Sequence, residues 1–494
     1  MDLRTKTVRG IGWSATSQMA KLLIQLFVFA VLARLLTPSD FGLIAMVVVF
    51  SSFVAIFSDF GLGFALVQKR EIDDTLLSSV FWINVVAGLL LTLSLALLAP
   101  LIALFFSEQA LIPIVVLIST TFFISSFGTV QMALLMKRMD FKSLGICSIL
   151  SVGISGGIAI FLAYSGYGVS SLAWNTVIAA IVAVILYWTY SRWIPRLTFS
   201  RHQVGEVLGF GLNLTGFSFV NYFSRNLDNL LIGRFLGAAS LGFYSLAYNL
   251  LILPISNISD VVGRVMFPAL SSIQDDLGAV REAYLNAARY VAAVGFPVMV
   301  WLVISAPQVI AVVYGPQWDR SILLLQILAF VGIVQSVAAT VGWIYTSQGR
   351  TDTFFRWGVL AAITYAISFA IGLHWNLEGV AVAYAIAGYI IAYPGFFIAF
   401  KLINLKFSYF LLQLKSIILA TFTLGVIAFT FRVTLEAFSG LTGASILVTV
   451  TAISALTYLG FIYALDRDLF IGIRELVKEF VLPRGKLPQD QSNK

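Results

Sequence analysis

The chain has 494 residues, of which 60% are hydrophobic and only 11% are charged, and its mean hydropathy is +0.95. Soluble domains carry about 25% charged residues, so this composition excludes an ordinary soluble protein and favours an integral membrane protein. The net charge of +8 does not indicate nucleic-acid binding, because the basic residues lie in short connections between apolar stretches, where membrane topology accounts for them.

Residue types that build metal and redox sites are scarce. Cys147 is the one cysteine, which rules out an intramolecular disulfide, and the two histidines, His202 and His374, are far apart in the sequence. No spacing of His, Cys, Asp or Glu is typical of a metal site, and the phosphate-binding pattern G-x-x-x-x-G-K-[ST] is absent. We therefore expect neither a cofactor nor direct ATP hydrolysis.

Apolar stretches long enough to cross a bilayer follow one another along the whole chain. A transmembrane helix needs about 20 mostly apolar residues, and this criterion predicts an all-α integral membrane protein of about 14 transmembrane helices. The first stretch contains Lys21 and runs on to Leu36 without a small-residue cleavage site, so we expect it to be retained as a span. The predicted spans lie near residues 11–36, 41–66, 76–106, 111–135, 144–164, 168–191, 206–236, 241–268, 288–313, 321–346, 356–373, 377–400, 411–432 and 441–465.

The connections between these spans differ strongly in charge. Roughly 23 lysines and arginines lie at the N-terminus, in alternate connections and in the C-terminal tail, whereas the opposite connections hold about two, Arg320 and Arg432. Basic residues concentrate on the cytoplasmic side of a membrane, so we expect both termini in the cytoplasm. The connections on the outer side are very short and leave no room for an outer soluble domain.

The sequence repeats itself at a spacing of about 200 residues. Residues 33–36 (ARLL) match residues 233–236 (GRFL), and without a gap residues 41–43 (FGL) match residues 241–243 (LGF). This spacing covers six predicted spans, so both copies have the same orientation and form a parallel repeat. We therefore expect two six-helix lobes with the substrate path between them, and two extra C-terminal helices.

The repeat and the spans predict four regions. Residues 1–205 form an N-lobe of spans one to six, residues 206–402 form a C-lobe of spans seven to twelve, and residues 403–466 hold the two extra spans. In residues 467–494, apolar side chains from Leu469 to Val481 recur at helical spacing and charged residues fill the other face. This pattern is typical of an amphipathic cytoplasmic helix on the membrane surface, and a polar tail follows it.

Four segments carry a resemblance to a known family. They are residues 33–42 (ARLLTPSDFG), 58–72 (SDFGLGFALVQKREI), 226–254 (NLDNLLIGRFLGAASLGFYSLAYNLLILP) and 265–276 (VMFPALSSIQDD). These segments resemble the Wzx-type polysaccharide flippases of the multidrug/oligosaccharidyl-lipid/polysaccharide (MOP) exporter superfamily, and the colanic-acid-exporter type most of all. The likeness covers nearly the whole chain.

The resemblance implies a transporter rather than an enzyme, located in the bacterial inner membrane. Its substrate would be an undecaprenyl-diphosphate-linked repeat unit, moved from the cytoplasmic to the periplasmic leaflet by alternating access, for O-antigen, exopolysaccharide or capsule assembly. Its partners would be this lipid-linked oligosaccharide, membrane lipids, and the polysaccharide polymerase and glycosyltransferases of the same pathway, without nucleic acid.

Ionisable residues inside the predicted spans are the candidates for a substrate site. Each costs roughly 2.5–3.5 kcal/mol at the centre of a span, so each needs a charged partner or a watery cavity. A diphosphate carries about two negative charges, and lysine and arginine suit phosphate oxygens. We hypothesise that Lys21, Arg225 and Arg264 face a central cavity and bind the diphosphate.

A structural role is the alternative for two of these cations. Arg225 and Asp228 are spaced i,i+3, and Asp260 and Arg264 are spaced i,i+4, so each pair can neutralise itself on one helix face. Such pairs would satisfy the buried charges without touching the substrate.

The remaining intramembrane charges have two interpretations each. Arg34 and Arg234 lie near the outer ends of their spans, where they are secondary candidates for diphosphate binding or anchor the helix ends at the lipid headgroups. Asp59, Asp228 and Asp260 are candidates for coupling transport to a proton or a sodium ion. For Asp59, a local capping role near the cytoplasmic end is the alternative.

Two other functions fit this chain less well. A membrane polymerase or ligase needs acid–base or metal groups on the outer side, where the connections are too short to hold them. A multidrug or cation antiporter of the same superfamily would favour an acidic, aromatic pocket, whereas buried Lys and Arg are at least as frequent here as buried acids. Aromatic residues near Trp343 and Tyr345 are further candidates for stacking on sugar rings.

Overall fold

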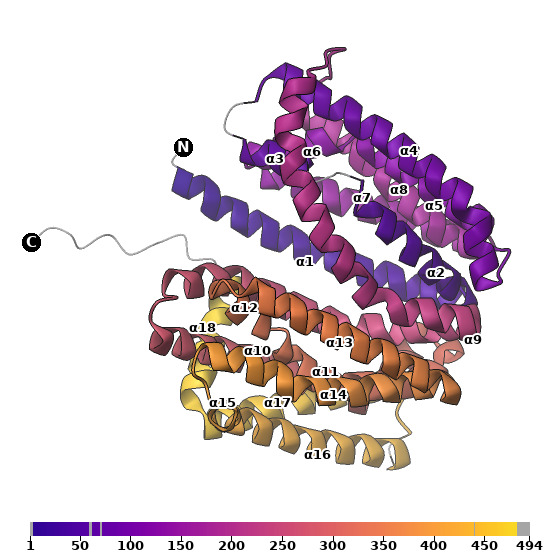
Figure 1. The fold of residues 1–494 in the computed structure, drawn as a ribbon. Helices are drawn as coiled ribbons and strands as arrows, with labels where there is room; N and C mark the ends of the chain where they lie inside the picture. Colours follow the sequence, from indigo (N-terminus) through magenta and orange to yellow (C-terminus); the bar gives the residue numbers. More distant parts are fainter. Residues whose placement is uncertain (1–2, 59–61, 70–71, 439, 482–494) are drawn as a thin grey trace, which may run out of the picture. The chain divides into compact units, whose positions relative to one another are not determined.

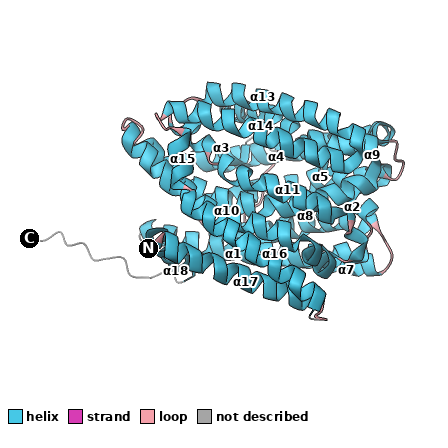
Figure 2. Cartoon of the chain, turned by 90° about the horizontal axis from the view of Figure 1, so that it is seen from below, coloured by secondary structure: helices cyan, strands magenta, loops and turns pink. Residues whose placement is uncertain are grey.

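The computed structural model describes residues 3–58, 62–69, 72–438 and 440–481. Every regular element in these ranges is a helix, as Figure 2 shows. The chain divides into two compact units, Met1–Ser245 and Leu246–Lys494. The lobe boundaries expected from the repeat stay a prediction.

The first unit is built from long helices joined by short connections. These are α1 (Leu3–Leu35), α2 (Pro38–Ala55), α3 (Leu62–Gln68), α4 (Asp74–Phe106), α5 (Leu111–Ser126), α6 (Thr129–Lys137), α7 (Phe141–Tyr164), α8 (Val169–Ser191) and the first part of α9 (Arg201–Ser272). Helix α4 packs along α5, α5 contacts α8, and α7 packs against both α1 and α8 (Figure 1). The helices α4, α5, α8, α7 and α1 therefore pack side by side in that order, and α2 packs against α5 and α8.

The second unit is organised around α10. Its elements after α9 are α10 (Leu277–Val309), η1 (Ile310–Tyr314), η2 (Pro316–Trp318), α11 (Arg320–Ala338), α12 (Val341–Ser347), α13 (Thr351–Gly372), η3 (Leu373–Trp375), α14 (Asn376–Leu402), α15 (Phe407–Gln413), α16 (Lys415–Phe438), α17 (Gly443–Leu465) and α18 (Arg467–Val481). Helix α10 packs against α11, α16 and α17, and it is apolar on several faces for that reason. The hydroxyl of Tyr458 on α17 donates to the carbonyl of Ala293 at 2.7 Å and ties the two helices together.

Side-chain caps fix the starts of several helices. At α2, Thr37 and Asp40 form a capping box, in which the Thr37 N–H donates to Asp40 Oδ2 at 2.9 Å and the Asp40 N–H donates to Thr37 Oγ1 at 3.3 Å. Asp73, Asp276 and Asp466 accept backbone N–H groups at the starts of α4, α10 and α18. Each cap satisfies donors that the helix itself leaves open, and is worth about 0.5–2 kcal/mol.

Helix α9 is broken at a single glycine. Its 72 residues are helical except at Gly237, where φ is 82° and ψ is 177°. Only glycine adopts this backbone conformation without strain, so the break falls inside the short connection that the sequence predicts between spans seven and eight. Pro254 and Pro268 also lie inside this helix.

The described residues contain most of the membrane spans that the sequence predicts. The described residues contain 11 helical segments long and apolar enough to cross a membrane, or up to 12 if the pair Leu111–Ser126 and Thr129–Lys137, bent by 46°, is one span. The predicted number of about 14 is therefore not confirmed. One of the 11 segments, Thr351–Leu402, contains α13 and α14, which pack against each other on either side of η3.

Many large apolar side chains point outward. Leu97, Leu456 and Phe422 are 78%, 72% and 70% exposed. Exposed apolar surface on this scale suits hydrocarbon rather than water. Together with the spans, it makes the chain a multi-pass membrane protein.

Candidate substrate pathway

Lys21 lies on the side of α1 that faces α7. Along α1 it is flanked by Ser17 and Val28, which pack against the glycines at positions 145 and 156 of α7 so closely that a Cβ would not fit there. Helix geometry places residues 17, 21 and 28 on one face of α1. Lys21 is partly exposed, and among the described residues its ammonium group has no hydrogen-bond or ion-pair partner. The diphosphate-binding role of Lys21 stays a prediction.

Arg34 and Arg234 occupy matching places at helix ends. Arg34 lies in the last turn of α1, Arg234 lies just before the break in α9, and both side chains are exposed. The Arg234 Nη1 donates to Ser107 Oγ at 2.9 Å, and its guanidinium lies 5.9 Å from the centre of the Phe105 ring. A cation at a helix C-terminus is stabilised by about 0.3–1 kcal/mol. This setting suits anchoring, and a secondary role in diphosphate binding stays a prediction.

Asp228 is a buried carboxylate with neutral partners. It is 4% exposed. The hydroxyl of Tyr244 donates to its Oδ2 at 3.0 Å, and the backbone N–H of Asn229 donates to its Oδ1 at 2.8 Å. Asp228 and Tyr244 lie on opposite sides of the Gly237 break, so this bond joins the two parts of α9. Sequence reasoning missed Tyr244, because its position opposite Asp228 depends on the turn at Gly237.

Four of the predicted site residues fall outside the described part of the structure. They are Asp59 and the side chains of Arg225, Asp260 and Arg264. The backbone of the last three is helical within α9. The diphosphate-binding role of Arg225 and Arg264, their pairing with Asp228 and Asp260, and the ion-coupling role of the acids therefore stay predictions.

The second unit holds an apolar cavity of about 840 Å³. Its wall comes from α10, α11, α14, α15 and α16, with Phe296, Val334, Phe396, Phe410 and Phe422 among the lining residues. Ile418 and Thr430 both line it from α16, so it extends for about 18 Å along that helix. This is more than half of the roughly 30 Å hydrocarbon core of a bilayer. Sequence reasoning did not predict this cavity.

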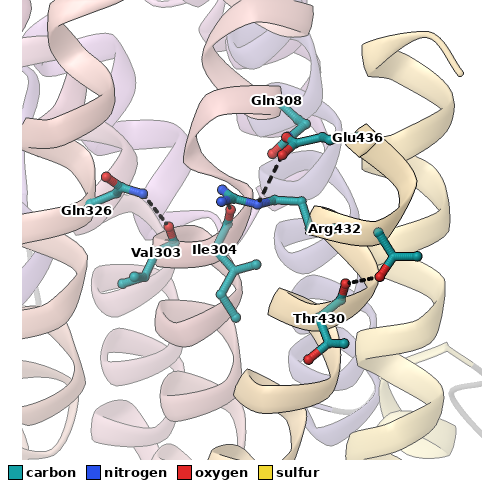
Figure 3. A network of polar contacts seen from close by, with 8 residues as sticks. Val303, Ile304, Gln308, Gln326, Thr430, Arg432 and Glu436 are labelled. Atoms are coloured by element: carbon teal, nitrogen blue, oxygen red, sulfur yellow. Dashed lines mark hydrogen bonds and ion pairs between the residues drawn. The ribbon is translucent and has the colours of Figure 1, made fainter. Parts of the chain in front are cut away.

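Figure 3 shows a network of polar contacts that includes Ile304 and Thr430, two residues that line this cavity. Arg432 donates through Nη1 to the carbonyl of Ile304 at 2.8 Å, and its Nε lies 4.0 Å from Glu436 Oε2. Gln308 donates to the other oxygen of Glu436. Arg432 lies within α16 and not in the outer connection that the sequence predicts for it. Its i,i+4 spacing from Glu436 is the sequence signal for this pair. Since Ile304 and Thr430 line the cavity, the network marks its polar end.

Tyr345 is not available to a sugar. It is fully buried and stacks on Phe354 with ring centroids 5.2 Å apart. The expectation that it stacks on sugar rings is therefore wrong, because its ring belongs to the core of the second unit. Trp343 is partly buried and packs against that core.

Comparison with known sequences points to one family. The family described as "Polysaccharide biosynthesis protein" matches residues 31–323. The chain is 30% identical over 461 residues to the teichuronic acid biosynthesis protein TuaB of Bacillus subtilis, a match that covers 93% of this chain and 95% of TuaB. It is also 30% identical over 382 residues to the lipopolysaccharide biosynthesis protein WzxC of Escherichia coli, covering 75% of this chain and 76% of WzxC.

Solved structures share the fold. The lipid II flippase MurJ in an inward closed conformation matches with a TM-score of 0.73 and 16% identity, over 94% of this chain and 99% of MurJ. An inward-facing multidrug resistance transporter of the MATE family, of the MOP superfamily, matches with a TM-score of 0.63 and 17% identity, over 78% of this chain and 94% of that chain. The architecture is therefore that of an all-helical membrane transporter.

Proposed function

Because this chain belongs to the polysaccharide biosynthesis protein family, we propose that it is a flippase that moves a lipid-linked oligosaccharide across the membrane by alternating access. The observation that carries the proposal is the agreement of two independent matches, one of sequence and one of fold. The sequence matches relatives named for polysaccharide biosynthesis over nearly its whole length, and the fold matches a lipid II flippase over 99% of that flippase. A transporter rather than an enzyme fits both.

The head group of such a substrate needs cations inside the membrane. Lys21 supports the proposal, since it is partly exposed in the middle of α1 and no carboxylate among the described residues neutralises it. A lysine in this state binds a phosphate as a point charge. We assign the diphosphate to Lys21, with Arg225 and Arg264 as further ligands and Arg34 and Arg234 as secondary ones.

The lipid tail needs an apolar surface while the head group crosses. We assign the tail to the cavity in the second unit, whose wall is almost wholly apolar. Its elongated form suits a long hydrocarbon chain better than a compact drug molecule. Moving a hydrocarbon from lipid into this cavity changes its free energy little, because both surroundings are apolar. The cavity therefore orients the tail more than it strengthens binding.

The finer assignments follow from the family and the charge pattern. We propose an undecaprenyl-diphosphate carrier and transport from the cytoplasmic to the periplasmic leaflet of the bacterial inner membrane. Both termini would lie in the cytoplasm, as the distribution of basic residues indicates. The polysaccharide polymerase and the glycosyltransferases of the same pathway would then supply and consume the substrate.

A multidrug or cation antiporter is the second candidate, supported by the fold shared with the multidrug transporter and by the buried Asp228 carboxylate. The named sequence relatives favour the flippase. A cation antiporter would also need Asp228 to be accessible, whereas it is 4% exposed and engaged by Tyr244.

Deletion of the gene in the native host tests the proposal. We expect diphosphate-linked oligosaccharide units to accumulate without being extended, and the wild-type gene to restore the polymer. Mass spectrometry of the extracted lipids would also identify the glycan. Loss of drug resistance with an unchanged lipid-linked pool would instead support the antiporter.

A further inference from the structure

The two copies of the sequence repeat meet at a pair of glycines. Gly42 lies near the start of α2, and Gly242 follows the Gly237 break in α9; the two are equivalent in the repeat, about 200 residues apart. A Cβ added at Gly42 would overlap the carbonyl oxygen of Ala238 and lie 3.0 Å from its Cα. A Cβ added at Gly242 would overlap the carbonyl oxygen of Pro38 and lie 2.7 Å from its carbonyl carbon.

The contact is reciprocal, and both sides require glycine. Pro38 and Ala238 are themselves equivalent in the repeat, and each helix places the glycine four positions later against the start of the other. The neighbouring atoms are backbone atoms, which cannot rotate away as a side chain can, so even alanine would push the two helices apart. Small residues at a contact let two membrane helices approach backbone to backbone.

Bulky side chains close the surroundings of this crossing. Leu241, Met46 and Phe106 are 0%, 1% and 4% exposed. A Cβ added at Gly233 would lie 2.8 Å from the Phe106 ring and 3.3 Å from both Leu241 and Met46. The first three turns of α2, the end of α4 and the residues beside the break in α9 are therefore packed closely together.

The charges at the crossing favour separation of the two helices. Each helix starts there and carries about half a positive charge at its N-terminus, so two like partial charges face each other. Asp40 offsets this charge on α2 through the capping box. Residues 238–242 (AASLG) contain no acid that would do so on α9. The closed contact thus depends on the close fit of two glycines.

We propose that Gly42 and Gly242 form the outer gate of the transporter, and that their crossing separates once in each transport cycle. The inference rests on the proposed function, because alternating access requires this end to open. The predicted orientation puts the connection before α2 and the Gly237 break on the outer side. A side chain at either glycine would hold the helices apart and favour the open state.

Chemical labelling of a buried position beside the crossing tests the gate. In a Cys147→Ser background, Leu241→Cys supplies the probe, and a membrane-impermeant maleimide is added to the outside of intact spheroplasts. We expect the labelling rate to rise at least about tenfold in Gly42→Ala and in Gly242→Ala, as a tenfold shift toward the open state requires. The double variant should label no more than about twofold faster than either, because one side chain already parts the contact.

Two glycines of α7 supply matched controls. A Cβ at Gly153 meets nothing within 4 Å, whereas one at Gly156 overlaps Val28, so Gly156→Ala crowds a helix contact away from the crossing. Both controls should label like the parent. Parental labelling in Gly42→Ala and Gly242→Ala would overturn the gate. The gate would also be overturned if Gly42→Ala and Gly242→Ala both failed to accumulate in the membrane while Gly156→Ala accumulated. The glycine contact would then be required for folding.

The same strains separate this inference from the proposed function. The parent with Leu241→Cys and Cys147→Ser is first tested for rescue of polysaccharide in the deletion strain. If the parent accumulates in the membrane and neither it nor the wild-type gene restores the polysaccharide, this result counts against the proposed function. Rescue by the parent together with unchanged labelling of the glycine variants counts against the gate alone.

Discussion

Replacing Tyr244 by Phe tests whether the buried Asp228 carboxylate depends on a neutral donor. Tyr244 is fully buried, and its hydroxyl donates to Asp228 Oδ2 at 3.0 Å. Removing the hydroxyl leaves a buried carboxylate oxygen with one partner fewer. An unsatisfied buried polar group costs about 1–3 kcal/mol, and an ionisable one belongs at the upper end. Because the two residues lie on either side of the Gly237 break, the loss acts on the turn that starts the second part of α9.

The assay measures the thermal midpoint of the detergent-solubilised protein. Size-exclusion chromatography after heating reports the fraction of protein that stays folded. Tyr345→Phe is the matched control, since Tyr345 is also fully buried but its hydroxyl has no hydrogen-bond partner among the described residues. We expect Tyr244→Phe to lower the midpoint by several degrees and Tyr345→Phe to leave it unchanged or raise it. Equal midpoints for the two variants would refute the reasoning.

Three further predictions concern transport and stability. Lys21→Ala should lower flipping at least about tenfold, as loss of a charge-assisted bond of about 1.5–3 kcal/mol implies, while Arg34→Ala keeps most of the activity; similar rates for both would contradict the assignment. Gly425→Leu narrows the apolar cavity, where overpacking costs about 1–3 kcal/mol, and should slow flipping about fivefold or more. Gly460→Leu is the control: a Cβ there meets open space, so flipping should not slow. Arg432→Met should lower the free energy of unfolding by about 1 kcal/mol, seen as a slightly lower thermal midpoint, and should leave flipping normal. A flipping defect would show that the network contacts the substrate.

The fold class was predictable from the sequence, but the ends of the helices were not. Hydropathy does not show whether a break bends a span or ends it, as between Leu111–Ser126 and Thr129–Lys137. Proline is a weak boundary signal inside a membrane, because neighbouring helices can satisfy the freed carbonyl groups; Pro254 and Pro268 accordingly lie inside α9. Gly237 was informative, since its backbone conformation is open to glycine and strained for other residues.

The candidate site was predictable only where local spacing determines it. The i,i+4 relation of Arg432 and Glu436 could have been found in the sequence. The bond between Asp228 and Tyr244 could not, because it depends on how the chain turns between them. The sequence repeat marked Gly42 and Gly242 as equivalent, but only the three-dimensional arrangement shows that each is packed against the start of the other helix.

Reconstitution tests the central claim most directly. The purified chain is placed in liposomes that carry a diphosphate-linked oligosaccharide lipid in both leaflets, and a glycosidase that cannot cross the membrane is added outside. The flippase account predicts that digestion passes from the outer-leaflet half of the substrate to nearly all of it, and that Lys21→Ala slows this second phase. Digestion that stops at the outer-leaflet half, with protein confirmed to be folded and inserted, would contradict it.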